Sequence, residues 1–321
     1  MNAPSNSALE KTRNSNFSLS TQILRQWSAP GIILAITNLA DEEVLLSHAV
    51  HQARRSTARV LLLHVLEPES LPPHTGEGTP PSAQQSLAES ALATLNRMAR
   101  QLRWVGVPCE PLLLRGSPAQ EILLVAKARG VDRLLVTTAC ARRTRSTAPR
   151  TLAEDLLSGA LVPLCSVGEC LPPTPVFGQP AGEITLALSL DSEAALPLAF
   201  AARLAQENGA KLTVMHVFGN ERKRRREIER TPLAVASQLP ADMLREAGLL
   251  CPLEIAIRKG DPVMEILKYG SRSNEDFIVL GPVSETQPLR AWTSNIVQRV
   301  ISEAHCPVIV LGPSLGILNN G

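Results

Sequence analysis

The histidines and cysteines are the side chains that could perform chemistry in this sequence. His64 and His216 end two similar apolar segments, but neither has a serine, cysteine or aspartate nearby in a catalytic pattern. The 6 cysteines form no C-x-x-C pair and do not combine with histidine at zinc-finger spacing. No hydrolase, zinc-protease, Walker or dinucleotide-binding motif occurs. We therefore expect reduced, mostly buried thiols, no metal site and no catalytic residue.

Two basic segments could bind an anionic partner. The run Arg222 to Arg226 could contact RNA, acidic lipid or an acidic protein, or it could be a solvated helix start paired with Glu227 and Glu229. A second group could bind phosphate or form a solvated loop: Arg142, Arg143, Arg145 and Arg150. We favour the solvated interpretation for both.

Short apolar segments alternate with segments of helical periodicity along the whole chain. The pattern predicts strands at 32–37, 58–66, 108–114, 134–138 and 162–167, and again at 184–189, 210–217, 253–257, 277–280 and 308–311. Helices are predicted at 42–55, 82–105 and 151–157, and one more begins with Ser117 as N-cap and Pro118 in its first turn. Apolar strands alternating with helices predict parallel sheets with crossover helices.

The second half of the sequence repeats the first. The segment Ala58 to Val65 resembles Ala210 to Val217 at an offset of 152, which also pairs Thr37 with Ser189. Later matches lie at an offset of 144, as between Gly116-Ser117-Pro118 and Gly260-Asp261-Pro262. Two constant offsets indicate two homologous units that differ by one insertion or deletion. We predict domains at 31–168 and 183–313, a linker at 169–182, a disordered arm at 1–30 and a tail at 314–321.

Composition narrows the class of protein. A net charge of +2 gives no global field for nucleic acid, and aromatic residues make up only 3%. No segment reaches the roughly 20 apolar residues needed to span a bilayer, and the first 30 residues lack the apolar core of a secretory signal. We therefore expect a cytoplasmic protein without a membrane span, and we do not expect nucleic acid as a partner.

Several segments together resemble the universal stress protein family. They are Gly260-Asp261-Pro262, Asp276 to Gly281 and Ala304 to Val310, with more divergent counterparts at Gly116 to Pro118 and Leu161 to Leu164. The resemblance implies an α/β, adenine nucleotide alpha-hydrolase-like, doubly wound fold: two tandem open five-stranded parallel sheets flanked by helices. It also implies an intrachain pseudo-dimer in which the last strands, 162–167 and 308–311, lie side by side. A homodimer of whole chains and an unidentified protein partner are further expectations.

Nucleotide-binding members of that family resemble one another at three places. An aspartate ends the first strand, a valine follows histidine at the end of the second, and a loop G-x2-G-x9-G-[ST] follows the fourth. Here Thr37 and Ser189 stand at the aspartate position, while Val65 and Val217 are kept. The loop positions fall on Thr137, Cys140, Arg150 and Thr151 in the first unit, and on Gly281, Ser284, Ser294 and Asn295 in the second. Most phosphate-binding glycines are therefore replaced.

These departures predict a non-catalytic stress-response or signalling module that acts through protein contacts, with degenerate nucleotide sites and no cofactor. The alternative is an ATP- or AMP-binding signalling protein that binds mainly through the second unit, which keeps Gly281. The cofactor-binding residues would then be Ser189, Val217, Gly281, Ser284, Ser294, Asn295, Thr37, Val65 and Thr151. A third hypothesis, an RNA- or membrane-associated adaptor, would use Arg222 to Arg226.

Overall fold

The computed structural model describes residues 31–40, 42–67, 81–138, 151–159, 162–168, 182–188, 195–218, 250–270, 277–281 and 296–312. Within these ranges the first unit contains β1 (Ile32–Ile36), α2 (Glu42–Ser56), β2 (Arg59–Leu66), α3 (Pro81–Trp104), β3 (Cys109–Arg115), α4 (Pro118–Arg129), β4 (Arg133–Thr137), α6 (Leu152–Gly159) and β5 (Leu164–Val167). The second contains β6 (Glu183–Ala187), α7 (Ala195–Asn208), β7 (Lys211–Phe218), β8 (Leu253–Lys259), α10 (Pro262–Gly270), β9 (Phe277–Leu280), α12 (Gln298–Glu303) and β10 (Val308–Val310). The predicted α/β fold and internal duplication are confirmed.

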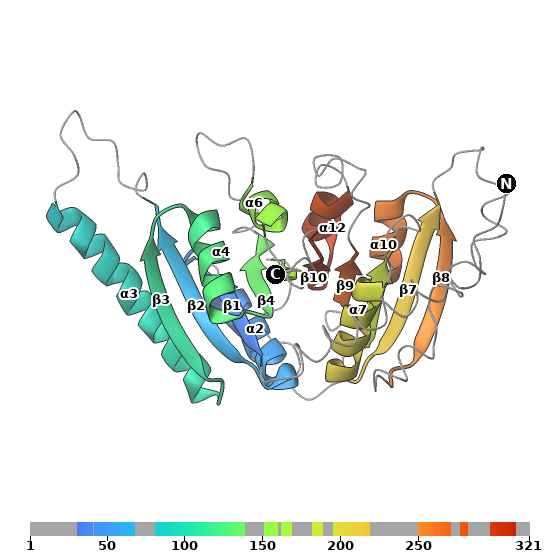
Figure 1. Cartoon of the computed structure of the whole chain (residues 1–321), viewed down its shortest axis with the longest axis horizontal. Helices are drawn as coiled ribbons and strands as arrows, with labels where there is room; N and C mark the ends of the chain where they lie inside the picture. The colour runs from blue at the N-terminus through green and yellow to red at the C-terminus, as the bar shows by residue number, and fades with distance from the viewer. Residues whose placement is uncertain are drawn as a thin grey trace, which may run out of the picture.

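The described strands form one sheet of 10 strands in the order β3-β2-β1-β4-β5-β10-β9-β6-β7-β8 (Figure 1). Within each unit the strands are parallel, and only β5 and β10 pair antiparallel, with Cys165 opposite Ile309. Each last strand thereby covers the edge that the other would otherwise expose. The predicted pairing through the last strands is confirmed, and it joins both units into one continuous sheet.

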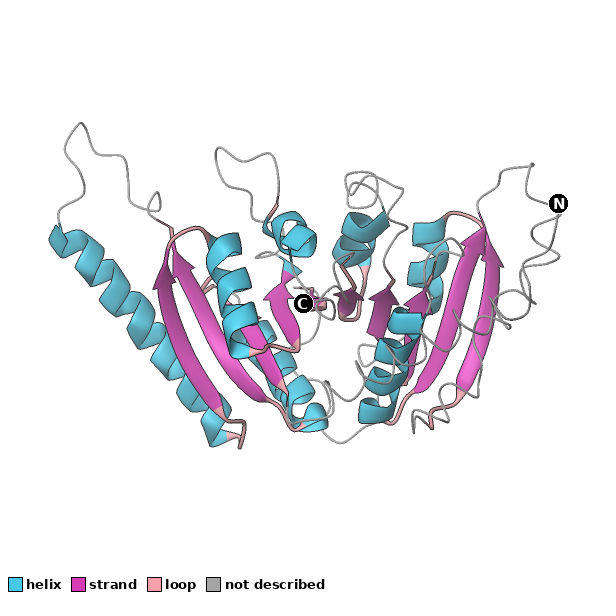
Figure 2. Cartoon of the chain, viewed as in Figure 1, coloured by secondary structure: helices cyan, strands magenta, loops and turns pink. Residues whose placement is uncertain are grey.

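Helices cover both faces of this sheet (Figure 2). Alternate residues of each strand face opposite sides, so Ile33 and Ala35 belong to one core while Leu34 and Ile36 belong to the other. The first core is closed by α2, α3 and α7, and the second by α4, α6, α10 and α12. Both cores contain residues of both units, so the apolar interior continues across the junction.

The two units begin and end their helices with different residues at matching positions. Ser117 stands at the N-cap of α4 but makes no side-chain cap hydrogen bond, whereas Asp261 Oδ1 accepts a bond of 3.0 Å from Met264 N at the start of α10. After α2, Thr57 has a φ of 52°, and after α7, Gly209 has a φ of 62°. A β-branched residue is strained in this left-handed conformation, which glycine adopts freely.

Several predicted segments lie outside the described residues: the arm at 1–30, most of the linker, the tail, and both basic runs, Arg222 to Arg226 and Arg142 to Arg150. The domain limits 31–168 and 183–313 stay a prediction. None of the helices in the described ranges is long and apolar enough to cross a membrane.

Candidate functional site

The strand order reverses between β1 and β4 in the first unit and between β6 and β9 in the second. In doubly wound sheets, ligands bind outside the carboxyl ends of the strands at such a reversal. The residues that follow these four strands are therefore the candidate site, once in each unit.

In the first unit, a histidine joins the ends of the first two strands. His64 Nδ1 lies 2.7 Å from the carbonyl oxygen of Thr37, and because a carbonyl only accepts, the imidazole donates from Nδ1. Thr37 is buried, and its Oγ1 accepts a hydrogen bond of 2.9 Å from the backbone of Leu39. The carbonyl oxygen and the hydroxyl of Thr37 thus both accept hydrogen bonds that shape the turn after β1.

The second unit repeats the histidine contact with a different partner. His216 Nδ1 lies 2.8 Å from the carbonyl oxygen of Leu188. Leu188 therefore takes the structural place of Thr37, which our sequence comparison gave to Ser189.

The strand register explains this correction. Ile36 pairs with Leu63 and Ala187 with Met215, so the offset between units is 151 in the first strand and 152 in the second. The predicted equivalence of Thr37 and Ser189 is wrong by one residue, because the second unit carries one additional residue after its first strand. If the offset of 151 is carried one residue beyond Thr37 and Leu188, Ser189 aligns with Asn38, whose Oδ1 accepts a hydrogen bond of 2.8 Å from the backbone of Ala40. Sequence reasoning missed Asn38, because only the strand pairing shows the change of offset.

Gly281, the glycine retained in the second unit, has a packing role. It follows β9, and its N–H donates to the carbonyl of Ala187 over 3.1 Å. A Cβ at this position would lie 2.5 Å from Leu188 Cδ2 and 3.4 Å from that carbonyl oxygen. In the first unit the matching pair is Thr37 and Thr137, both buried. A leucine beside a glycine thus replaces two threonines, and this explains the glycine without a ligand.

The two retained valines contribute to the core of the sheet. Val65 is buried and Val217 is partly buried, and both pack in the core that is shared with α4 and α10. Neither needs a nucleotide to account for its burial.

The start of α6 is occupied by a side chain of the same helix. Thr151 Oγ1 accepts a hydrogen bond of 3.3 Å from the backbone of Glu154, and Glu154 Oε2 accepts one of 2.7 Å from the backbone of Thr151. This reciprocal capping box satisfies two amides that would otherwise face an anion. Asp155 adds a second carboxylate to the first turn. Negative charge therefore already stands at the helix end that a phosphate would approach.

The capping carboxylate also links the two units. Glu154 Oε1 accepts a hydrogen bond of 2.8 Å from Gln298 Nε2, in the first turn of α12. Gln298 is the counterpart of Glu154 at the offset of 144, so one position of the repeat meets its own copy across the junction. No acidic residue occupies the first turn of α12 itself.

The other predicted site residues, Ser189, Ser284, Ser294 and Asn295, lie outside the described residues, as do Cys140 and Arg150. The structure brings together Thr37 and His64 at the strand ends of the first unit, and Leu188 and Gly281 at the strand ends of the second.

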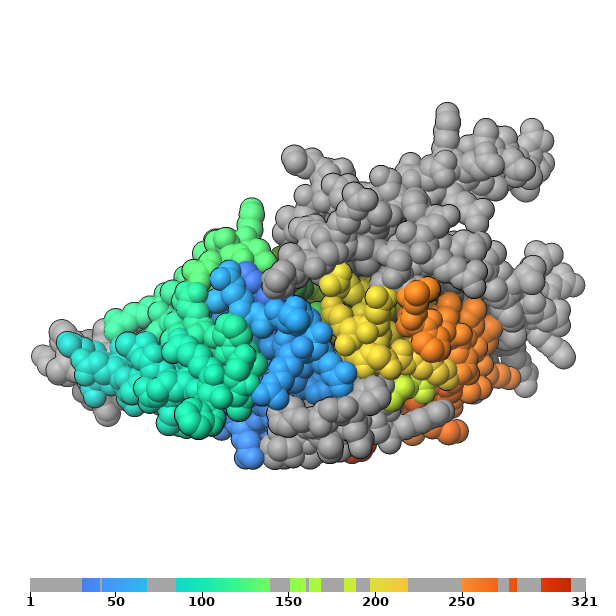
Figure 3. Space-filling view, turned by 90° about the horizontal axis from the view of Figure 1, so that it is seen from below, coloured from blue at the N-terminus to red at the C-terminus, as the bar shows by residue number. Residues whose placement is uncertain are grey.

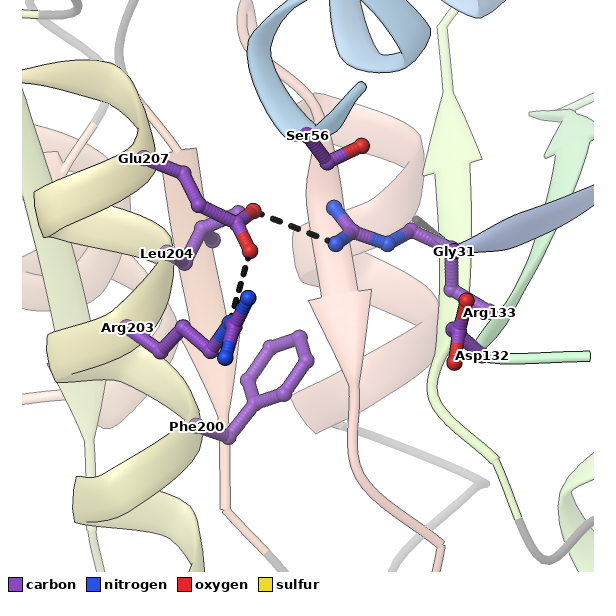
Figure 4. Close-up of a pocket in the computed structure, with 8 residues that line it drawn as sticks. All are labelled: Gly31, Ser56, Asp132, Arg133, Phe200, Arg203, Leu204 and Glu207. Atoms are coloured by element: carbon purple, nitrogen blue, oxygen red, sulfur yellow. Dashed lines mark hydrogen bonds and ion pairs between the residues drawn. The ribbon is translucent and has the colours of Figure 1, made fainter. Parts of the chain in front are cut away.

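A cleft between the units lies at the amino-terminal ends of the strands, where β1 and β4 begin (Figure 4). Glu207 of α7 crosses it and pairs with Arg133 at 3.3 Å and with Arg203 at 2.8 Å. Its cavity volume of about 20 Å³ has room for about one water molecule. Its lining is Gly31, Ser56, Asp132, Arg133, Phe200, Arg203, Leu204 and Glu207. This cleft is a polar joint between units, separate from the strand ends.

Comparison with known proteins agrees with this architecture. The sequence profile of the Universal stress protein family matches residues 31–152 and 182–312, so the chain belongs to that family as a tandem of two such domains. Its structure is similar to a universal stress protein from Archaeoglobus fulgidus, with a TM-score of 0.65 and 16% identity over 88% of this chain and 96% of that one. It also resembles a protein described as a putative universal stress protein from Pseudomonas aeruginosa, with a TM-score of 0.58 and 18% identity over 90% and 95% of the two chains.

Among curated proteins, a universal stress protein of Methanocaldococcus jannaschii is 36% identical over 53 residues, which are 16% of this chain. The chain covers only 31% of the length of that relative. The structural neighbours named above share less than a fifth of their residues with this chain and therefore show the fold alone.

Proposed function

We propose that this tandem universal stress protein is a non-catalytic signalling module of the cytoplasm that acts through protein contacts and has lost nucleotide binding in its first unit. The observation that carries the proposal is the capping box of Thr151 and Glu154. Its carboxylate takes the place at the start of α6 where a bound phosphate would need free amides and positive potential. A phosphate there would face Glu154 and Asp155 at close range.

The second unit supports the same proposal less strongly. The contact with Leu188 accounts for Gly281, and the second unit has Ser189 where nucleotide-binding members have an aspartate. However, α12 begins without an acidic residue. Binding of ATP or AMP by the second unit is therefore the second candidate function, with Gly281 and Val217 among its contacts.

The test is binding of adenine nucleotide by the purified full-length chain. A ligand at about 100 times its Kd would stabilise the folded state by about 2.7 kcal/mol. We expect no shift of the thermal midpoint with magnesium ATP or with AMP, and no nucleotide released on denaturing the freshly purified protein.

A clear rise of the midpoint, or nucleotide identified by mass spectrometry in the denatured sample, would contradict the proposal. The variants Gly281→Ser and Thr151→Ala would then locate the site. Loss of binding in the first variant alone would establish the second unit as the binding unit.

A further inference from the structure

The helices α2 and α7 meet where the two units join, and the repeat pairs their residues at an offset of 152. Figure 3 shows their surfaces, blue and yellow, side by side on one face of the molecule. The counterpart pairs near the joint are His48 and Phe200, His51 and Arg203, and Gln52 and Leu204. The first unit thus contributes two histidines and a glutamine where the second contributes two buried apolar side chains and an arginine.

Three polar side chains of α2 are buried, and two of them are incompletely hydrogen-bonded within the described part of the chain. His48 is 4% exposed and its Nε2 has no hydrogen-bond partner there. His51 is 7% exposed and shares a hydrogen bond with Asn208 of α7, across the junction. Gln52 Nε2 donates to Cys165 Sγ over 3.3 Å, while its Oε1 has no partner. A neutral imidazole can be held here, whereas an added proton would bring an unpaired charge into the interior.

The charged groups on the elements packed around α2 give little compensation for such a charge. Nearest the contact with α7 are Arg55 on α2 itself, Asp132 and Arg133 at the start of β4, and Arg203 and Glu207 on α7, while β5 contributes the thiol of Cys165. At its other end α2 carries Glu42 and Glu43, and Glu42 is bound by Arg97 of α3. Of the strands beneath α2, β1 has no charged residue and β2 begins with Arg59. Glu207 is already shared by two arginines (Figure 4). Asp132 accepts a hydrogen bond from the backbone of Ile32. The surroundings of the histidines are therefore rich in guanidinium groups, and the nearby carboxylates are already engaged.

The proton equilibria follow from this geometry. Burial, with a smaller contribution from His51, lowers the pKa of His48 from 6.5 to about 4. Burial and the neighbouring Arg55 also lower the pKa of His51, against the opposing effect of its bond to Asn208. His51 contacts Asn208 of α7, and His48 is the counterpart of Phe200, which lines the cleft between the units. Separation of the units would therefore bring water to both rings and return their pKa to about 6.5. Acid therefore favours separation between about pH 6.5 and pH 4.

We propose that the contact between α2 and α7 is a pH-sensitive joint: protonation of His48 and His51 in acid weakens it and loosens the two units from each other. Asp132 acts in the opposite direction, because burial raises the pKa of its carboxyl and its protonation favours the closed arrangement. The joint goes beyond the proposed function, because it lies toward the amino-terminal ends of the strands, away from the candidate site at their carboxyl ends, and it needs no nucleotide.

Hydrogen exchange of the full chain at pH 7 and pH 5 tests the joint, with intrinsic rates corrected for pH. A group whose pKa rises from about 4 to 6.5 on opening shifts the opening equilibrium by roughly thirtyfold at pH 5. We expect amides of α2 and α7 to exchange at least about tenfold faster at pH 5, while amides of β2 change little. The double variant His48→Phe with His51→Gln should remove the difference, because it copies Phe200 and keeps a polar group for Asn208.

The variant His305→Gln is the matched control, since it removes an exposed histidine outside the joint and should exchange like the wild type. Equal protection of α2 and α7 at both pH values would overturn the proposal, and so would an acid response that persists in the double variant. If the double variant does not fold, NMR titration of the wild-type rings decides. Midpoints well below about 6.5 support the joint, and midpoints near that value contradict it.

Discussion

The two units of this chain share a backbone and differ in the side chains that complete it. Both use a histidine to tie the ends of their first two strands, and both close their last strand against the other unit. Yet two threonines in one unit correspond to a leucine and a glycine in the other. The difference teaches that local volume is conserved across such an exchange even where chemistry is not, because a packed interior tolerates changes of residue type better than changes of total volume.

The central strand pair makes the comparison sharpest. Cys165 and Ile309 are counterparts in the repeat and lie opposite each other in β5 and β10, where both are completely buried. A small thiol therefore packs beside a large aliphatic side chain. Two cysteines would have a smaller total volume at this place, and two isoleucines a larger one.

The largest effect is expected from truncating this pair. Ile309→Ala should lower the free energy of unfolding by about 4 kcal/mol, because it leaves a cavity in the middle of the continuous sheet. Cys165→Ala removes a thiol and the acceptor for Gln52 Nε2, and should cost about 2 kcal/mol. Urea denaturation measures both. Equal decreases in the free energy of unfolding would show that β5 and β10 contribute equally to the packing at the junction.

Much of this architecture follows from the sequence alone. Apolar periodicity predicts the order of strands and helices along the chain, and the repeat predicts which strands are counterparts. The pairing of β5 with β10 follows from the resemblance to the family. What the sequence could not supply is the additional residue between β6 and β7, because a one-residue change of offset between two strands leaves the periodicity of each strand intact.

Side-chain contacts across the junction were equally inaccessible. Nothing in the spacing of His48 and His51 distinguishes a helix face packed on another unit from one packed on its own sheet. Thr151 stands directly before a predicted helix, a position where threonine commonly acts as N-cap, and its Oγ1 accepts the capping hydrogen bond from Glu154 N. The link from Glu154 to Gln298 depends on how two distant helices are placed, which no local pattern encodes.

A medium effect is expected at this link. Glu154→Ala removes the carboxylate half of the capping box and the acceptor for Gln298, and should lower the free energy of unfolding by about 1 kcal/mol. Gln298→Ala removes only the exposed bond between units and should cost less than that. Thermal denaturation of the two variants separates capping from bridging. A greater loss in Gln298→Ala would mean that the bridge matters more than the cap.

The smallest effect is expected at the turn that follows α2, and the equivalent turn after α7 should respond with the opposite sign. Thr57→Gly should raise the free energy of unfolding by roughly 0.5 kcal/mol, since relief of left-handed strain exceeds the entropy that glycine adds to the unfolded chain. Gly209→Ala should lower it by about 1 kcal/mol at the equivalent position. Chemical denaturation at constant slope checks the opposite signs. Changes of the same sign would show that the two turns are not equivalent.

The meeting of Glu154 with Gln298 has a consequence for how such a molecule evolves. In a symmetric pair of separate chains, this position would face an identical residue, so that every substitution would occur twice at the axis. Joining the copies in one chain makes the position two independent genetic sites. One copy can then hold an acceptor and the other a donor, and selection can give each half of the molecule its own task.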